Sequence, residues 1–149
     1  MINYNNLCMG CMREIGEEKK CPYCGYHADT VQSTPYLPVK TVIAKRYLAG
    51  KVIDYNGEGV TYIGWDLKEN RAVNIREFLP SSITARTQSN LFLQVRLGSE
   101  GAYAGMRRSF EELWTKLLKL SGLSALINVT DVVEDYSTSY AIYDTTFYF

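Results

Sequence analysis

The chain has 149 residues, and sixteen basic residues balance sixteen acidic ones, so its formal net charge is zero. This balance argues against a domain whose main task is nucleic-acid binding, because such domains present a clustered basic surface to phosphates. The sequence has no run of 18 apolar residues and no signal-peptide pattern near its start, so we expect neither a membrane span nor export. We therefore expect a cytoplasmic chain with one ordinary domain and a small appendage.

All four cysteines lie in the first 24 residues, as two C-x-x-C pairs that nine residues separate: Cys8 and Cys11, then Cys21 and Cys24. Two such pairs, each turning tightly so that its thiolates converge, are typical of a closed tetrahedral Zn²⁺ site. The spacing predicts a zinc ribbon over residues 1–27. Its zinc would be structural, because four thiolates leave no open position and so short a segment buries little apolar surface without metal.

Other chemistry stays open for the same cysteines. An iron ion also binds four thiolates, and disulfides form in an oxidising compartment, although no export signal is present. His27 follows Cys24 by three residues and is an alternative ligand. A solvent-facing histidine is the simpler interpretation, since four thiolates already complete the site.

Residues 28–38 are rich in Ser, Thr and Pro and predict a semi-extended linker to a second domain at 39–149. That domain opens with three alternating apolar segments separated by short turns, which predict an antiparallel meander: 46–55, 59–67 and 71–79. Polar residues 81–87 have turn-like character. A further short strand is expected at 90–97, and residues 98–105 break the pattern.

The clearest helix spans 107–121, where apolar residues recur at helical spacing: Phe110, Leu113, Trp114, Leu117 and Leu118. Ser109 and Glu112 predict a capping box at its start, and Gly122 predicts its stop. Arg107 and Arg108 stand before Ser109, at the start of this segment. We expect them to be exposed to solvent, and binding of an acidic partner is the alternative.

Two strands, 127–135 and 139–149, close the chain. The order of elements indicates an α+β fold with five antiparallel strands and one helix on one face.

This order, with these residues, resembles the N-terminal lobe of a protein kinase, most of all the lobe of bacterial serine/threonine kinases that carry a zinc ribbon before the kinase domain. The resemblance covers residues 38–146. Residues 46–66 resemble the first two strands and the glycine-rich loop, and residues 73–77 stand where the family has Val-Ala-Ile-Lys-Glu. Residues 109–120 resemble the helix with the ion-pairing glutamate, and residues 137–145 the strand before the interlobe hinge.

The resemblance implies a nucleotide site whose residues are altered here. Asp54 and Asn56 stand at the first two glycine positions of the loop, while Gly57 and Gly59 remain. A carboxylate at the start of the loop would repel a polyphosphate, and fewer glycines hinder the approach of backbone N–H groups.

The remaining nucleotide-site positions are altered as well. The lysine that pairs with the phosphates stands as Arg76, a wider planar fork, and its partner glutamate aligns with Leu113, one residue from Glu112. Asn74 stands where the family has a small residue above the adenine, and the bulky Tyr143 stands at the gatekeeper position. Together these changes imply a degenerate site that no longer binds ATP with Mg²⁺.

Catalysis in this family also needs a His-Arg-Asp loop and an Asp-Phe-Gly aspartate from a C-terminal lobe, and this sequence has neither. We therefore expect a lone N-lobe-like domain or part of a pseudokinase-like protein, and not an enzyme. The favoured hypothesis is a noncatalytic interaction or regulatory scaffold in bacterial signalling. The alternatives are the nucleotide-binding part of a serine/threonine kinase whose C-lobe is missing, and a zinc-ribbon protein associated with nucleic acid.

The last ten residues, 140–149, contain five aromatic side chains. An alternating strand buries one face, so the others would contact a protein partner, the missing C-lobe or a second copy in a homodimer. An ordinary strand core is the alternative.

Overall fold

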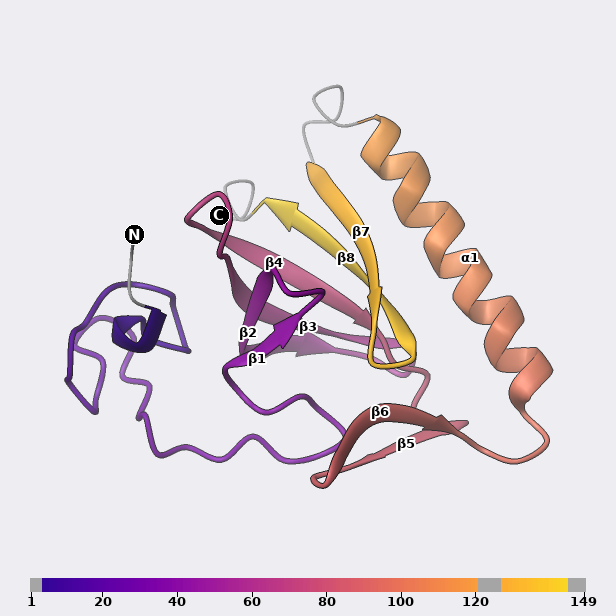
Figure 1. Cartoon of the computed structure of the whole chain (residues 1–149), viewed down its shortest axis with the longest axis horizontal. Coiled ribbons are helices and arrows are strands. Elements are labelled where there is room, and N and C mark those ends of the chain that lie inside the picture. Colours follow the sequence, from indigo (N-terminus) through magenta and orange to yellow (C-terminus); the bar gives the residue numbers. More distant parts are fainter. Residues whose placement is uncertain (1–3, 121–126, 145–149) are drawn as a thin grey trace.

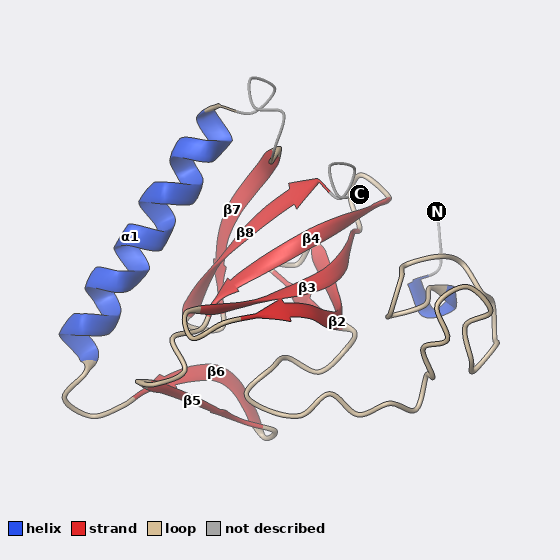
Figure 2. Ribbon diagram, turned by 180° about the vertical axis from the view of Figure 1, so that it is seen from behind, coloured by secondary structure: helices blue, strands red, loops and turns tan. Residues whose placement is uncertain are grey.

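The computed structural model describes residues 4–120 and 127–144. Six strands form one antiparallel sheet in the order β1-β2-β3-β4-β8-β7. Their bounds are Thr41–Ile43 (β1), Tyr47–Tyr55 (β2), Gly59–Asp66 (β3), Arg71–Phe78 (β4), Val129–Asp135 (β7) and Thr138–Asp144 (β8). The other elements are the 3-10 turn η1 (Tyr4–Asn6), the hairpin strands β5 (Thr84–Thr87) and β6 (Asn90–Val95), and the helix α1 (Glu100–Lys119). Helix α1 lies along β7 on one side of the sheet, and the N-terminal segment lies on the other side (Figure 1 and Figure 2).

The α+β class and the meander of β2, β3 and β4 are confirmed. The sheet has six strands and not five, because residues 41–43 pair with the first residues of β2. The turn expected at 81–87 is also wrong, since residues 84–87 form a strand of the separate hairpin. Polar sequence misleads there because Arg86 points to a buried carboxylate and not to solvent.

The helix begins seven residues earlier than predicted, at Glu100. Tyr103 stabilises the added turns, because it is buried and its hydroxyl donates a hydrogen bond to the Ser137 carbonyl at 2.6 Å. Ser109 therefore lies inside the helix and cannot cap it, so the predicted capping box is wrong.

Arg107 also lies inside α1, and it does not face solvent as expected. Its Nε donates to Ser139 Oγ at 2.9 Å and its Nη2 to the Thr138 carbonyl at 3.0 Å, so it fixes the helix to β8.

No helix in the described part of the chain has the length and apolar character needed to span a bilayer.

Side chains link the two edges of the sheet, so the sheet curls towards a closed barrel. The Tyr47 hydroxyl donates to Asp131 in β7 at 2.5 Å. The N–H of Ala44, just after β1, donates to Asp135 in β7 at 2.7 Å. Edge strands that meet in this way offer little free backbone to another chain.

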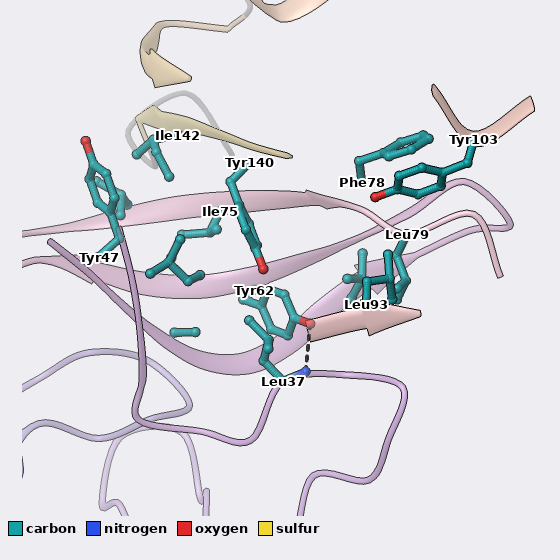
Figure 3. Packing of buried hydrophobic residues seen from close by; sticks show 14 residues of the cluster. Leu37, Tyr47, Tyr62, Ile75, Phe78, Leu79, Leu93, Tyr103, Tyr140 and Ile142 are labelled. Carbon is teal, nitrogen blue, oxygen red and sulfur yellow. Dashed lines mark hydrogen bonds between the residues drawn. The ribbon is translucent and has the colours of Figure 1, made fainter. Parts of the chain in front are cut away.

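Large side chains from four strands fill the inner face of the curled sheet (Figure 3). Those with almost no exposure include Tyr47, Tyr62, Ile75, Tyr140 and Ile142. Leu37, from the segment expected to be a linker, is also fully buried, and its N–H donates to the Tyr62 hydroxyl at 2.9 Å (Figure 3). Part of residues 28–38 therefore contributes to the core.

A buried ion pair lies within this core. The side chains of Glu77 and Arg86 are both fully buried, and the guanidinium donates two hydrogen bonds to the carboxylate at 2.9 and 3.1 Å. The hydroxyls of Tyr62 and Tyr140 donate to the same carboxylate at 2.8 and 2.5 Å. These four bonds offset the cost of removing both ions from water.

The same guanidinium also holds two flanking segments. Its Nε donates to the Leu91 carbonyl at 2.7 Å, and Nη1 donates to the Pro35 carbonyl at 2.9 Å. Burial and the neighbouring carboxylate raise the pKa of Tyr62 and Tyr140 well above the ordinary value, so both hydroxyls stay protonated donors at neutral pH.

Removing the charge of Glu77 should destabilise the whole domain. In Glu77→Gln the Arg86 guanidinium stays buried without a counter-ion, so we expect the free energy of unfolding to fall by about 3–5 kcal/mol. Urea denaturation followed by circular dichroism measures this change. The double variant Glu77→Leu/Arg86→Met removes both charges and should cost less than the sum of its single variants. A loss below about 1 kcal/mol in Glu77→Gln, as for a surface pair, would contradict this account.

Candidate functional site

The four cysteine side chains converge near the N-terminus. Their Sγ atoms all lie within 4.8 Å of one another, with Cys8–Cys24 at 3.5 Å and Cys11–Cys21 at 3.7 Å. A tetrahedral Zn²⁺ with Zn–S bonds of about 2.3 Å holds its sulfur ligands about 3.8 Å apart, whereas a disulfide bond is about 2.0 Å long. The four predicted ligands therefore have the spacing of a metal site, which is consistent with structural zinc.

The two halves of this cluster repeat one backbone pattern. In the first half, the Cys8 N–H donates to the Arg13 carbonyl, and the Cys8 carbonyl accepts from the Met12 N–H. In the second half, the Cys21 N–H donates to the Tyr26 carbonyl, and the Cys21 carbonyl accepts from the Gly25 N–H. Met12 and Gly25 hold equivalent positions, with φ of 63° and 79°, which is the left-handed conformation that ends each turn. A Cβ on Gly10 would lie 2.6 Å from Tyr26 Cβ and 3.1 Å from Cys24 Sγ, so the first turn also needs a glycine there.

Hydrogen bonding differs among the thiols. Burial raises the pKa of Cys8 to about 12. At Cys21 the backbone N–H groups of Cys24 and Tyr23, each 3.4 Å from Sγ, outweigh the effect of burial and lower the pKa to about 6. A cation at the centre of the cluster favours the thiolate form of every ligand, so it would bring both cysteines to the same charge state.

His27 does not belong to this cluster. Its side chain is about half exposed, and its Nδ1 accepts a hydrogen bond from the Asp29 N–H at 3.1 Å. The simpler interpretation of this histidine, as a solvent-facing residue, agrees with its exposure.

Three apolar residues attach the cysteine-rich segment to the sheet. Leu7, Met9 and Met12 pack against Leu48 and Trp65. The Met9 carbonyl also accepts a hydrogen bond from the N–H of Lys51 in β2 at 2.8 Å. The cysteine cluster and the sheet therefore support each other through one shared apolar cluster.

The loop between β2 and β3 is the segment that resembles a glycine-rich loop, and it forms a closed turn. The Asn56 N–H donates to the Gly59 carbonyl at 2.9 Å. The Asn56 Oδ1 accepts from the N–H groups of Glu58 and Gly59, both at 2.9 Å. Backbone N–H groups that a phosphate would need are thus already bonded within the loop.

The tip of the loop is attached to the chain that follows β4. The Gly57 carbonyl accepts from the Ser81 N–H at 3.1 Å, and the Glu58 carbonyl accepts from the Leu79 N–H at 2.9 Å. Asp54 is exposed and pairs with Thr61 in the ladder of β2 and β3. The loop is therefore held to the end of β4.

Arg76 completes this closure. Its Nη1 donates to Thr61 Oγ1 at 3.1 Å, and its Nη2 donates to Asn56 Oδ1 at 3.0 Å. A Cβ on Gly59 would lie 3.0 Å from Arg76 Nε and 2.7 Å from the Glu77 carbonyl, so this glycine is needed for packing. Within the described residues, no carboxylate forms an ion pair with Arg76.

Asn74 and Tyr143 lie opposite each other in β4 and β8, and both are buried. Tyr143 stacks on Trp114 of α1, with ring centroids 5.7 Å apart and an angle of 18° between the planes. A polar amide and an aromatic pair therefore occupy the region where the resemblance places the adenine. Tyr140 is buried in the core, and the aromatic residues at 147–149 lie outside the described residues.

A groove of about 380 Å³ lies between β4 and α1. Its lining includes Arg76 and an apolar stripe of the helix formed by Met106, Phe110, Leu113 and Trp114. Leu113, at the position aligned with the ion-pairing glutamate, is 55% exposed. The apolar spacing predicts a stripe on this helix, but which of its residues stay exposed in a groove depends on the neighbouring elements and cannot be read from the spacing.

The comparisons with known proteins agree with the fold. No protein-family model matches the sequence. No curated protein matches it either. A solved structure, the apo form of PpkA-294 from a bacterial serine/threonine kinase, superposes with a TM-score of 0.67 at 22% identity. The match covers 74% of this chain and 39% of that chain. The predicted resemblance to the N-terminal part of such a kinase is thereby confirmed as a likeness of fold.

Proposed function

We propose that this chain is a noncatalytic module that serves as a protein-interaction or regulatory scaffold in bacterial signalling. The observation that carries the proposal is the closed loop between β2 and β3, in which Asn56 Oδ1 accepts from the N–H groups of Glu58 and Gly59. A nucleotide phosphate would have to displace a side chain that Arg76 also holds. Loss of these bonds would oppose phosphate binding.

The position of Arg76 supports the same proposal. Its guanidinium donates two hydrogen bonds to neutral acceptors, Asn56 and Thr61, so two of its N–H donors hold the loop, and within the described residues it forms no ion pair of the catalytic kind. The core depends on the Glu77–Arg86 pair, which needs no ligand. A domain of this kind keeps its shape without a nucleotide, as a scaffold requires.

Under this proposal the N-terminal segment, residues 1–27, holds one structural Zn²⁺ through Cys8, Cys11, Cys21 and Cys24. Residues 28–38 connect it to an N-lobe-like domain at 39–149. The partner is a protein, either a separate chain or the C-terminal lobe of a longer protein. A homodimer formed through the aromatic C-terminal strand is the alternative, and an ATP/Mg²⁺ cofactor is not expected.

The purified chain should carry about one zinc ion, as measured by elemental analysis. Removal of zinc with a strong chelator should release Leu7, Met9 and Met12 from Trp65, which is 8% exposed in the structure. In a Trp114→Phe background, where Trp65 is the only tryptophan, we expect its emission to shift to the red and to recover when zinc returns. Iron in place of zinc, or a Trp65 emission maximum that does not change when the metal is removed, would show that the assignment of a structural zinc is wrong.

The zinc-loaded chain should show no thermal shift and no calorimetric heat with millimolar ATP, with or without Mg²⁺. The physical reason is that bound ligand raises the melting temperature by mass action, and a closed loop leaves no phosphate site. A clear, Mg²⁺-dependent shift would overturn the scaffold proposal. It would favour the alternative, in which the chain is the nucleotide-binding part of a serine/threonine kinase.

A further inference from the structure

The groove between β4 and α1 combines an exposed apolar wall with a single cation. Leu113 and Met106 are 55% and 37% exposed although both line the groove. Phe110 and Trp114 complete the wall, and their rings pack with centroids 6.0 Å apart and an angle of 48° between the planes. A fixed aromatic wall with exposed aliphatic side chains is typical of a surface that takes an apolar side chain.

The cation of the groove is oriented before any ligand arrives. Thr61 and Asn56 hold two of the N–H donors of Arg76, and both acceptors are neutral. An arginine has five N–H donors in a planar fork that matches a carboxylate. Arg76 therefore retains both charge and donors for an acidic group.

The nearest acidic residues of α1 do not supply that group. Glu111 accepts a hydrogen bond from Ser139 Oγ at 2.7 Å, so it is engaged with β8. Glu112 lies with Arg108 and Lys116 on another surface of the helix. The next residue in sequence, Leu113, lines the groove and has no charge.

We propose that this groove docks a segment of a partner protein that carries an Asp or Glu beside a large apolar side chain. The carboxylate pairs with the Arg76 guanidinium, and the apolar side chain lies against Phe110, Leu113 and Trp114. The partner thus supplies the acidic group that the helix lacks. This inference rests on the proposed scaffold function and specifies the chemistry of its partner.

Glu58 also lines the groove, and it weakens binding of any anion. An isolated anion should therefore bind poorly. An acidic group linked to an apolar side chain should bind better, because it contacts both Arg76 and the apolar wall. Glu58 is exposed and contributes to the closed loop through its backbone N–H and carbonyl, so Glu58→Gln should leave the fold unchanged and report this balance directly.

The test is a nitrogen-15 NMR titration of the full chain with a capped peptide, Ala-Asp-Leu-Phe-Ala, and with the matched peptide that has Asn for Asp. We expect shifts confined to β4 and α1, and about tenfold weaker binding of the Asn peptide, because a charge-assisted bidentate pair is lost. Arg76→Gln and Leu113→Asp should each weaken the Asp peptide about tenfold. Glu58→Gln should strengthen it about two- to threefold.

Leu97→Asp is the matched control, since Leu97 is 93% exposed and does not line the groove. This variant should bind as the unmodified chain does. Equal binding of the two peptides, no groove shifts at millimolar peptide, or tighter binding of free 3-phenylpropionate than of the Asp peptide would each overturn the proposal. The peptide titration tests the docking groove, whereas the ATP titration tests the scaffold function, so failure of one proposal can be distinguished from failure of the other.

Discussion

The carboxylate of Glu77 joins β4 to three other elements of the domain. It accepts hydrogen bonds from Arg86 of the hairpin, Tyr62 of β3 and Tyr140 of β8. Arg86 in turn holds the carbonyl of Pro35. A buried charge of this kind is tolerated only when its partners are all in place, so the positions of the hairpin, the connecting segment and β8 depend on one another.

Strand β4 carries two different roles on its two faces. Because side chains alternate along a strand, Glu77 points into the core while its neighbour Arg76 points towards α1. The register that fixes the ion pair therefore also places the Arg76 guanidinium beneath the loop, where it bonds to Asn56. The closed loop is in this sense a consequence of the core. The domain has the architecture of a kinase N-lobe, and interactions within its own chain hold that architecture.

The sequence predicted the parts whose signal is local. Cysteine spacing predicted the cluster, and alternation predicted β2, β3 and β4. Glu77 and Arg86 were not recognised as a pair, because a charged residue in a short strand is usually solvent-facing and the partner lies on another element. Asn56 was identified as a lost glycine, but its bonds to the loop depend on a side-chain conformation that sequence does not reveal. The early start of α1 was missed because Tyr103 contacts a distant carbonyl.

Hydrogen exchange at the amides of Glu58 and Gly59 tests the central claim most directly, namely that the loop between β2 and β3 is closed by hydrogen bonds within the chain. Both N–H groups are bonded to Asn56 Oδ1, so the account predicts slow exchange that Mg²⁺ and ATP do not change, and faster exchange in Asn56→Ala. Fast exchange in the unmodified chain that slows when Mg²⁺ and ATP are added would contradict it, because the loop would then be open and occupied by a nucleotide.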